Sequence, residues 1–302
     1  MSLSSTRLSK RASLLHLSAL KLAQSMRSGN FKSLYRGQGI EFQDVREYLP
    51  GDNVRLIDWN VTARMGRAFI KQYNEDRELS VLILLDCSPS MYLPIQNKSK
   101  LSCAIETAAL LLLACEQNDG AIGAVFFDGK IQFSCPPKSG RENSMMLLSK
   151  FDTLDSNSHA SVTEGSERAN GSALTAALKG AAKILKKRSL VFVISDFRTT
   201  GWEEHMARLS QKNDVVSIRI TDSYDKKLPK MGTASFFDTE THKKHIFPTL
   251  SKDFAQKWEE AEHKRSQTWK DACTKHRVHP LMLSTEDDCV HILSQFFDST
   301  KG

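Results

Sequence analysis

The chain has 302 residues, of which 40% are hydrophobic and 25% are charged, and its formal net charge is +7. This length and composition are ordinary for a soluble globular protein with one large or two modest domains. They exclude a membrane-spanning protein, because the longest apolar run, at 108–115, is far shorter than the roughly 18 residues of a span. We expect no secretory signal, and six scattered cysteines without a C-x-x-C motif predict reduced core thiols in the cytoplasm.

The N-terminal segment, 1–34, is predicted to be a basic amphipathic helix. Seven basic and no acidic residues precede Glu41, so the net charge of +7 resides there and the rest of the chain balances to zero. Such a face suits an acidic protein, RNA or an anionic membrane surface, while a solvated helix face and an organellar transit peptide are alternative interpretations. No aromatic stacking pattern accompanies the charges, so specific nucleic-acid recognition is not expected. The apolar stripe of this helix consists of Leu8, Ala12, Leu15, Ala19, Leu22 and Met26.

Residues 35–78 are predicted to form a small β-rich subdomain. Strand-like apolar positions at 54–61 lead through a turn at 64–66 into 68–73, which predicts a β-hairpin. Dense charges of alternating sign predict cross-strand ion pairs, and we also expect this segment to dock a partner. These charges are Arg46, Glu47, Asp52, Arg55, Asp58 and Arg64.

The strongest signal is the stretch 79–90, which reads LSVLILLDCSPS. Its first seven residues are apolar except for one serine, which is typical of a strand buried on both faces of a parallel sheet. Asp86, Ser88 and Ser90 follow at the carboxyl end of this strand, where ligands of open α/β sheets bind. One carboxylate and two hydroxyls suit Mg²⁺ or Mn²⁺, and ordinary turn and cap residues are the alternative interpretation.

The remainder of the chain alternates between predicted helices and predicted strands, as in a doubly wound, mostly parallel sheet with helices on both faces. This α/β domain is expected to span 79–298, with a polar loop at 155–170 and an excursion of short strands at about 223–277. Helices are predicted at 100–117, 142–154, 174–187, 202–211, 252–276 and 287–297, and strands at 121–127, 131–135, 190–194, 215–220 and 278–283.

Five polar side chains are expected to meet above the carboxyl edge of this sheet. Asp86, Ser88 and Ser90 are joined by Ser172, which opens the helix after the polar loop, and by Asp196 at the end of the second apolar strand. Two carboxylates neutralise a divalent ion, three hydroxyls leave its shell incomplete, and no third carboxylate is expected at these strand ends. Such an ion takes up water or the acidic side chain of a partner protein.

This set of motifs resembles the von Willebrand factor A fold with its metal-ion-dependent adhesion site, and more closely the bacterial domain-of-unknown-function 58 (DUF58) family. The resemblance covers roughly residue 37 to the C-terminus. Ser172 stands where the adhesion site usually has threonine, and Phe197 stands where many A domains have glycine. The N-terminal family signature is found at 46–52 (REYLPGD), Arg55, 57–59 (IDW), 63–64 (AR) and Lys71.

The resemblance implies a non-enzymatic protein-interaction module, an adaptor or co-chaperone that works with a MoxR-type AAA+ ATPase. An aspartyl-phosphate phosphatase would need a second carboxylate two residues after Asp86, where Ser88 stands. The sequence also contains no G-x-x-x-x-G-K-[ST] phosphate loop and no G-x-S-x-G elbow. We therefore predict no enzymatic activity. A metal-dependent hydrolase and a basic protein that binds nucleic acid or membrane surfaces remain the alternatives.

Overall fold

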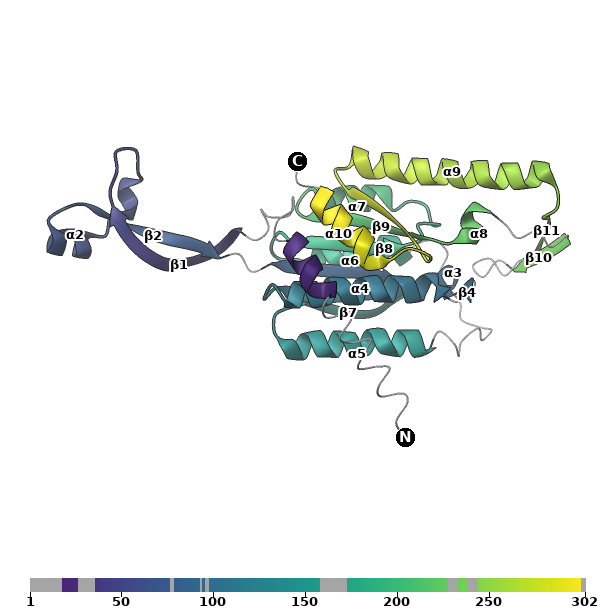
Figure 1. The fold of residues 1–302 in the computed structure, drawn as a ribbon, viewed down its shortest axis with the longest axis horizontal. Helices are drawn as coiled ribbons and strands as arrows, with labels where there is room; N and C mark the ends of the chain where they lie inside the picture. The colour runs from purple at the N-terminus through teal and green to yellow at the C-terminus, as the bar shows by residue number, and fades with distance from the viewer. Residues whose placement is uncertain are drawn as a thin grey trace, which may run out of the picture.

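A six-stranded sheet in the order β12-β9-β8-β3-β6-β7 forms the centre of the protein (Figure 1). The computed structural model of the chain describes residues 18–26, 36–76, 79–92, 94–95, 98–157, 173–227, 233–237 and 244–299. Five strands are parallel, and β7 pairs with β6 in the antiparallel direction. The strands are β3 (Ser80–Asp86), β6 (Ala121–Asp128), β7 (Lys130–Lys138), β8 (Leu190–Ser195), β9 (Asp214–Thr221) and β12 (His279–Ser284).

Strand β3 lies between β6 and β8, and all seven of its residues are buried. Successive side chains of β3 point to opposite faces of the sheet, and each face is covered by a layer of helices. Both faces of the strand are therefore buried, which explains why its apolar residues are consecutive and do not alternate with polar ones. Its one polar residue before the carboxyl end, Ser80, accepts a hydrogen bond at 2.9 Å from the hydroxyl of Ser189, so this buried hydroxyl is satisfied.

Helices cover both faces of the sheet, as predicted. On one face, α4 (Lys100–Glu116), α5 (Arg141–Asn157) and α10 (Cys289–Ser299) share a core with Val81, Ile83 and Leu85. On the other face, α6 (Ala173–Ile184), α7 (Glu203–Ser210) and α9 (Lys252–Lys275) share a core with Leu82 and Leu84. This is the expected α/β fold with a mostly parallel sheet and helices on both faces. The shorter elements are α3 (Pro89–Tyr92), α8 (Ser223–Lys226), β4 (Pro94–Ile95), β5 (Lys98–Ser99), β10 (Thr233–Phe237) and β11 (Lys244–Pro248).

A helix at 18–26 packs on the same face as α4 and α10. The predicted apolar stripe is confirmed in this part, because Ala19, Leu22 and Met26 are all buried, whereas Leu8, Ala12 and Leu15 lie outside the described residues. The side-chain amide of Asn118 donates to the carbonyl of Ala23 at 3.2 Å. Within the described ranges, no helix is long and apolar enough to cross a bilayer.

Residues 36–76 form an arm that extends away from the six-stranded sheet (Figure 1). Its antiparallel strands are β1 (Arg36–Glu47) and β2 (Phe69–Asp76), and the segment between them contains η2 (Val54–Leu56) and α2 (Trp59–Met65). The predicted hairpin was therefore wrong in its first strand, which is β1 and not the stretch 54–61.

Helix capping explains this difference. The carboxylate of Asp58 accepts hydrogen bonds from the amides of Asn60 at 2.9 Å and Val61 at 3.2 Å, which starts a helix. Gly66 ends it with φ of 67°, a left-handed conformation that glycine adopts without strain. These two local signals outweigh the short run of strand-like apolar positions.

The predicted cross-strand ion pairs in the arm are replaced in part by a pair between the end of β1 and the loop that follows it. The guanidinium of Arg46 donates to both carboxylate oxygens of Asp52, at 2.7 and 2.9 Å, and Asp52 also accepts the amide of Leu49 at 2.8 Å. The hydrogen bond from Arg46, followed by that from Leu49, holds the pKa of Asp52 below its ordinary value. Arg46 therefore fixes the turn around Gly51, where φ is 107°.

We expect Leu22→Ala to destabilise the whole protein by about 2–5 kcal/mol, because it deletes a buried side chain from the main core. The matched control is Leu20→Ala in the same helix, where the side chain is exposed and the change should stay within about 0.5 kcal/mol. Urea unfolding monitored by circular dichroism measures both. Equal stabilities of the two variants would show that this helix does not share the core.

Candidate metal centre

The loop after β3 folds back on itself and gathers the three predicted oxygen donors. Asp86 is buried at the carboxyl end of the strand, and one of its oxygens accepts the amide of Ser88 at 2.9 Å. The hydroxyls of Ser88 and Ser90 lie 3.1 Å apart. The other oxygen of Asp86 accepts a 2.5 Å hydrogen bond from the hydroxyl of Ser195 on the neighbouring strand β8. This bond ties the loop after β3 to the end of β8.

Asp196 follows β8 directly and is also buried. Its Oδ1 accepts the amide of Arg198 at 3.3 Å, while its Oδ2 has no hydrogen-bond partner among the described residues. Burial first, and then repulsion from Asp196, raise the pKa of Asp86 to about 7. The negative charge of Asp196 therefore acts on Asp86, and a cation beside them would relieve this repulsion. Ser172, the fifth predicted donor, lies outside the described residues.

Phe197 turns the chain between Asp196 and Arg198. It has φ of 52°, a left-handed conformation that favours glycine, and this accounts for the glycine common at this position in A domains. Its amide donates to the hydroxyl of Ser195 at 3.0 Å. Its ring packs against Trp202 and Trp269, at centroid distances of 5.2 and 5.9 Å, so aromatic packing offsets the backbone strain.

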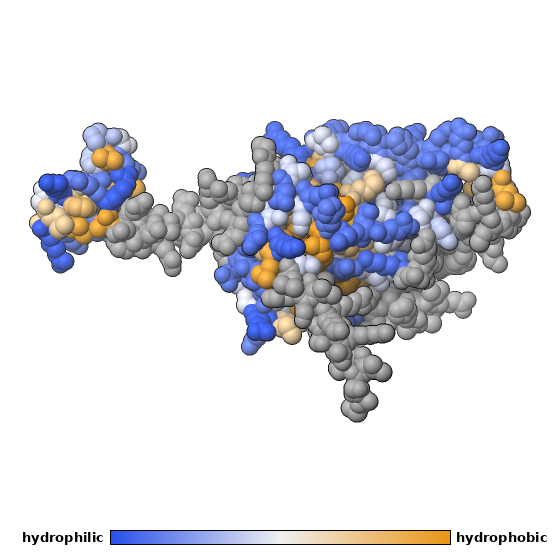
Figure 2. Space-filling view, viewed as in Figure 1, coloured by the Kyte–Doolittle hydropathy of each residue, from blue (hydrophilic) through white to orange (hydrophobic). Residues whose placement is uncertain are grey.

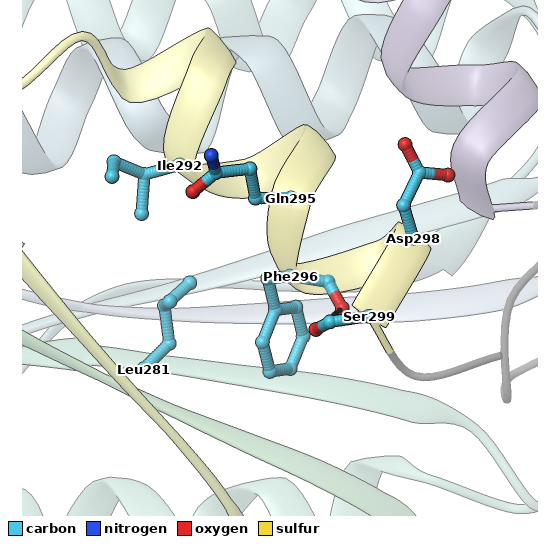
Figure 3. A pocket seen from close by; sticks show the side chains of 6 residues that line it. All are labelled: Leu281, Ile292, Gln295, Phe296, Asp298 and Ser299. Carbon is cyan, nitrogen blue, oxygen red and sulfur yellow. Dashed lines mark hydrogen bonds between the residues drawn. The ribbon is translucent and has the colours of Figure 1, made fainter. Parts of the chain in front are cut away.

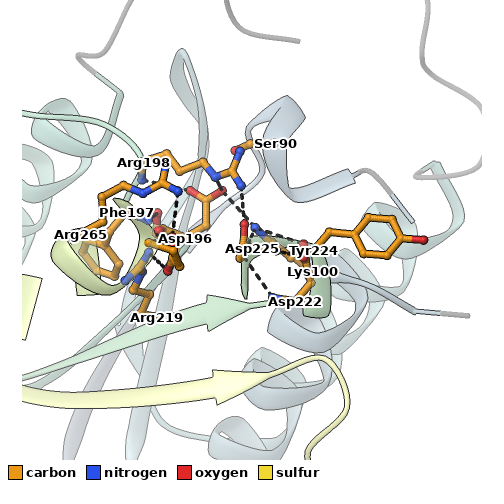
Figure 4. A network of polar contacts seen from close by, with 12 residues as sticks. Ser90, Lys100, Asp196, Phe197, Arg198, Arg219, Asp222, Tyr224, Asp225 and Arg265 are labelled. Atoms are coloured by element: carbon orange, nitrogen blue, oxygen red, sulfur yellow. Dashed lines mark hydrogen bonds and ion pairs between the residues drawn. The ribbon is translucent and has the colours of Figure 1, made fainter. Parts of the chain in front are cut away.

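A buried lysine beside Asp196 was not predicted from the sequence (Figure 4). Lys100, only 2% exposed, is the first residue of α4. Its ammonium nitrogen lies 2.7 Å from Asp225, 3.3 Å from Asp222 and 3.8 Å from Asp196. Arg198 also forms ion pairs with Asp196, at 3.5 Å, and with Asp225. We call Lys100, Asp196, Arg198, Asp222 and Asp225 the ion network.

The ion network corrects the expectation that no third carboxylate stands at these strand ends. Asp222 directly follows β9 and Asp225 lies in α8, so both are near the carboxyl edge. Burial raises the pKa of Asp225, but the charges of Lys100 and Arg198 more than offset this and leave it below its ordinary value. The edge therefore holds two more aspartates than predicted, each within 3.3 Å of the ammonium group of Lys100.

Two elements of the excursion hold the ion network in place. Asp222 and Asp225 form a capping box, in which each carboxylate accepts the backbone amide of the other residue at 2.8 and 3.1 Å. The indole nitrogen of Trp258 on α9 donates to the carbonyls of Tyr224 and Asp225, both at 3.1 Å. The long helix α9 thus clamps the α8 turn against the edge of the sheet.

Some signal for the missed residues was present in the sequence. Asp222 follows an apolar strand just as Asp196 does, so the strand-end rule applied to β9 would have found it. A lysine at the first position of a helix, as at Lys100, opposes the helix dipole and therefore suggests a nearby anion. No local sequence pattern indicates that Lys100 contacts Asp222 and Asp225, which lie more than a hundred positions later in the chain.

The fold and this edge define an α/β protein with a mostly parallel sheet and a buried acidic cluster at the carboxyl ends of its central strands. The family described as "Protein of unknown function DUF58" matches residues 44–268, and the chain belongs to this family. It is 27% identical over 232 residues to uncharacterised proteins of Mycobacterium bovis and Mycobacterium tuberculosis, which covers 76% of this chain and 70% of each relative.

Two solved structures show weaker similarity. The conserved hypothetical protein BatB from Bacteroides thetaiotaomicron is 16% identical, with a TM-score of 0.44, over 74% of this chain and 98% of that one. The manganese-loaded TRAP protein of Plasmodium vivax is also 16% identical, with a TM-score of 0.34, over 47% of this chain and 57% of that one. Similarity at this level carries no information about ligands.

Lys100→Met should destabilise the protein by about 3–5 kcal/mol, because it leaves buried carboxylates of the ion network without their shared cation. The control is Lys179→Met on α6, whose side chain is exposed and whose loss should change stability by less than about 0.5 kcal/mol. Urea unfolding measures both variants. Equal stabilities would contradict a structural role for the buried ammonium group.

The metal-free protein should lose stability as the pH rises towards 8. The pKa of Asp86 is about 7 in the folded protein against 3.8 for the ordinary side chain, so the folded state binds an extra proton between these values. The protonated carboxyl group of Asp86 therefore makes its full contribution to the free energy of unfolding below about pH 4, and this contribution is lost as the pH rises through about 7. Urea unfolding in EDTA between about pH 5 and 8 measures this loss. The Asp86→Asn variant cannot ionise at this position, so its free energy of unfolding should not show this fall with pH. If the free energy of unfolding of the variant falls with pH as steeply as that of the wild type, other groups cause the loss.

Proposed function

We propose that this chain is a non-enzymatic protein-interaction module that binds a divalent metal ion, Mg²⁺ or Mn²⁺, at the carboxyl edge of its sheet. The observation that carries this proposal is the pair of buried carboxylates of Asp86 and Asp196, one of whose oxygens has no hydrogen-bond partner among the described residues. Ser88 and Ser90 add hydroxyl oxygens beside Asp86. Hard oxygen donors of this kind are the ligands that Mg²⁺ and Mn²⁺ prefer.

Each of these residues has a separate role in the proposed site. Asp86 and Asp196 supply negative charge, and Ser88, Ser90 and Ser172 supply neutral oxygens. When bound, the metal acts as an electrophile that accepts an acidic side chain of a partner, a charge-assisted contact stronger than a neutral one. The three aspartates of the ion network are shared with Lys100 and Arg198, so they do not saturate the ion.

The ion pairs also support a binding role over catalysis. Lys100, Asp222, Asp225 and Arg198 neutralise one another and are held by short contacts. A general acid or base must contact the substrate, whereas these groups contact one another. Their effect is to position Asp196, which suits a site that holds a metal and a partner's carboxylate.

The proposed partner is a MoxR-type AAA+ ATPase in the cytoplasm, which this chain would serve as an adaptor or co-chaperone. The family resemblance suggests this partner.

A second surface for the same partner is the arm, where apolar side chains face solvent (Figure 2). Helix α2 buries none of its residues, and Trp59 is 69% exposed. Exposed apolar groups gathered on one small element are typical of a binding surface. The others on the arm are Leu49, Val54, Leu56 and Met65.

Millimolar Mg²⁺ or Mn²⁺ should stabilise the wild-type protein, by about 2.7 kcal/mol at roughly 100 times the dissociation constant. Asp86→Ala should abolish this gain, because it removes a charged ligand. The matched control is Asp214→Ala at the opposite end of the sheet, where the carboxylate pairs with Arg188 at 2.9 Å and the metal effect should persist. Thermal melting and calorimetry measure the stabilisation by metal in each protein. Equal stabilisation of wild type and Asp86→Ala would refute the site.

Binding to the ATPase should fall in EDTA, recover with Mg²⁺ or Mn²⁺, and be lost in Ser88→Ala with the fold intact. A pull-down with both purified proteins measures this. Trp59→Ala should weaken the complex while the metal-induced rise in melting temperature stays unchanged, which separates the arm from the metal. A complex equally tight in EDTA would place the interface elsewhere, such as the basic N-terminus. Metal-dependent phosphoester turnover that Asp86→Ala abolishes would identify a hydrolase instead.

A further inference from the structure

Two cysteines far apart in sequence meet beneath the C-terminal helix. Cys103 lies near the start of α4 and Cys289 is the first residue of α10, 186 positions later. Their sulfur atoms are 3.9 Å apart, within hydrogen-bonding distance for thiols. We propose that Cys103 and Cys289 are a redox modification site that forms an intramolecular disulfide when a peroxide oxidises the protein.

The two thiols have different acidities, which gives each a separate role. The hydrogen bond between them is the largest cause in both cases, and it lowers the pKa of Cys289 and raises that of Cys103. Burial and the charge of Glu106 oppose the thiolate form of both sulfurs, and the ammonium group of Lys98, which pairs with Glu106 at 2.7 Å, favours it. Because Cys289 also follows the exposed turn at 286–288, we assign it as the attacking thiolate and Cys103 as the resolving thiol.

Only a small movement brings the sulfurs into bonding distance. A disulfide bond is about 2.0 Å long, so they must approach by about 1.9 Å from their separation of 3.9 Å. The second half of helix α10 borders a pocket of about 630 Å³ (Figure 3), which leaves room for a small shift of this helix. The pocket is lined by Leu281, Ile292, Gln295, Phe296, Asp298 and Ser299.

The same position of α10 gives an oxidant access to the buried thiols. Both cysteines are buried in the closed structure. The turn before Cys289 contains exposed residues at 286–288, so Cys289 directly follows an exposed stretch of the chain. Local opening next to such a turn exposes buried groups without global unfolding.

The chemistry is a balanced two-electron oxidation by hydrogen peroxide. The thiolate of Cys289 attacks one peroxide oxygen, the O–O bond breaks, and the products are a sulfenic acid and hydroxide, which takes up the released thiol proton as water. The sulfur of Cys103 then attacks the sulfenic sulfur. An S–S bond forms, the S–O bond breaks, and a second water leaves. Two thiols are oxidised, one peroxide is reduced to two waters, and a dithiol reductant reverses the reaction.

The test treats the full-length protein with stoichiometric hydrogen peroxide and then alkylates the remaining thiols under denaturing conditions. Before alkylation, the mass of the intact protein should fall by about 2 Da for the two hydrogen atoms lost. Of the six cysteines, two should then resist alkylation. Peptide mapping should show Cys103 linked to Cys289, dithiothreitol should restore both thiols, and the oxidised protein should melt at a higher temperature because the bond joins α10 to α4.

The matched control is Cys115→Ala, since Cys115 is also buried on α4, and this variant should still lose two thiols. Cys103→Ala should lose the intramolecular link. Should that variant fail to fold, the peptide map of the wild-type protein decides alone. Six alkylated thiols after peroxide treatment, a bridge to any other cysteine, or a bridge between two chains would each overturn the proposal.

Discussion

The burial of negative charge at the carboxyl edge of the sheet is the constraint on which the rest of the structure depends. Strand β3 is buried on both faces, so it delivers Asp86 to a place shielded from water, and β8 does the same for Asp196. Burying a carboxylate costs several kcal/mol unless it is paired and hydrogen-bonded. Hydrogen bonds from Ser88 and Ser195 offset part of this cost for Asp86, and Lys100 and Arg198 offset part for Asp196.

Several elements that seem peripheral in the fold take their positions from this constraint. Helix α4 places Lys100 at its first position, where the helix dipole alone would disfavour a cation, and the surrounding aspartates reverse that preference. The excursion after β9 supplies Asp222 and Asp225, and Trp258 on α9 fixes them through two backbone carbonyls. A long, mostly exposed helix thus contributes to the carboxyl edge through one indole.

Sequence patterns predicted the centre of the sheet because its four inner strands, β3, β6, β8 and β9, are buried almost throughout and carry nearly continuous apolar runs. Asp86 and Asp196 were found for the same reason, since each ends such a run. The contacts of Lys100 were not predictable, because they join residues from three separate elements and depend on the folded topology. The arm was mispredicted because a short run of strand-like apolar positions was weighted above the capping residues Asp58 and Gly66.

The arm follows a different physical logic from the sheet. A helix as short as α2 is marginal in water and draws its stability from caps and neighbours, not from burial. Here Asp58 and Gly66 cap it, and the Arg46–Asp52 pair fixes the preceding turn. Polar contacts within the arm therefore hold its shape while its apolar side chains, including Trp59, stay at the surface. Because these apolar side chains are not buried when the arm folds, their surface is available for contact with a partner. The partner contact proposed for the arm is therefore separable from the metal site proposed for the carboxyl edge of the sheet.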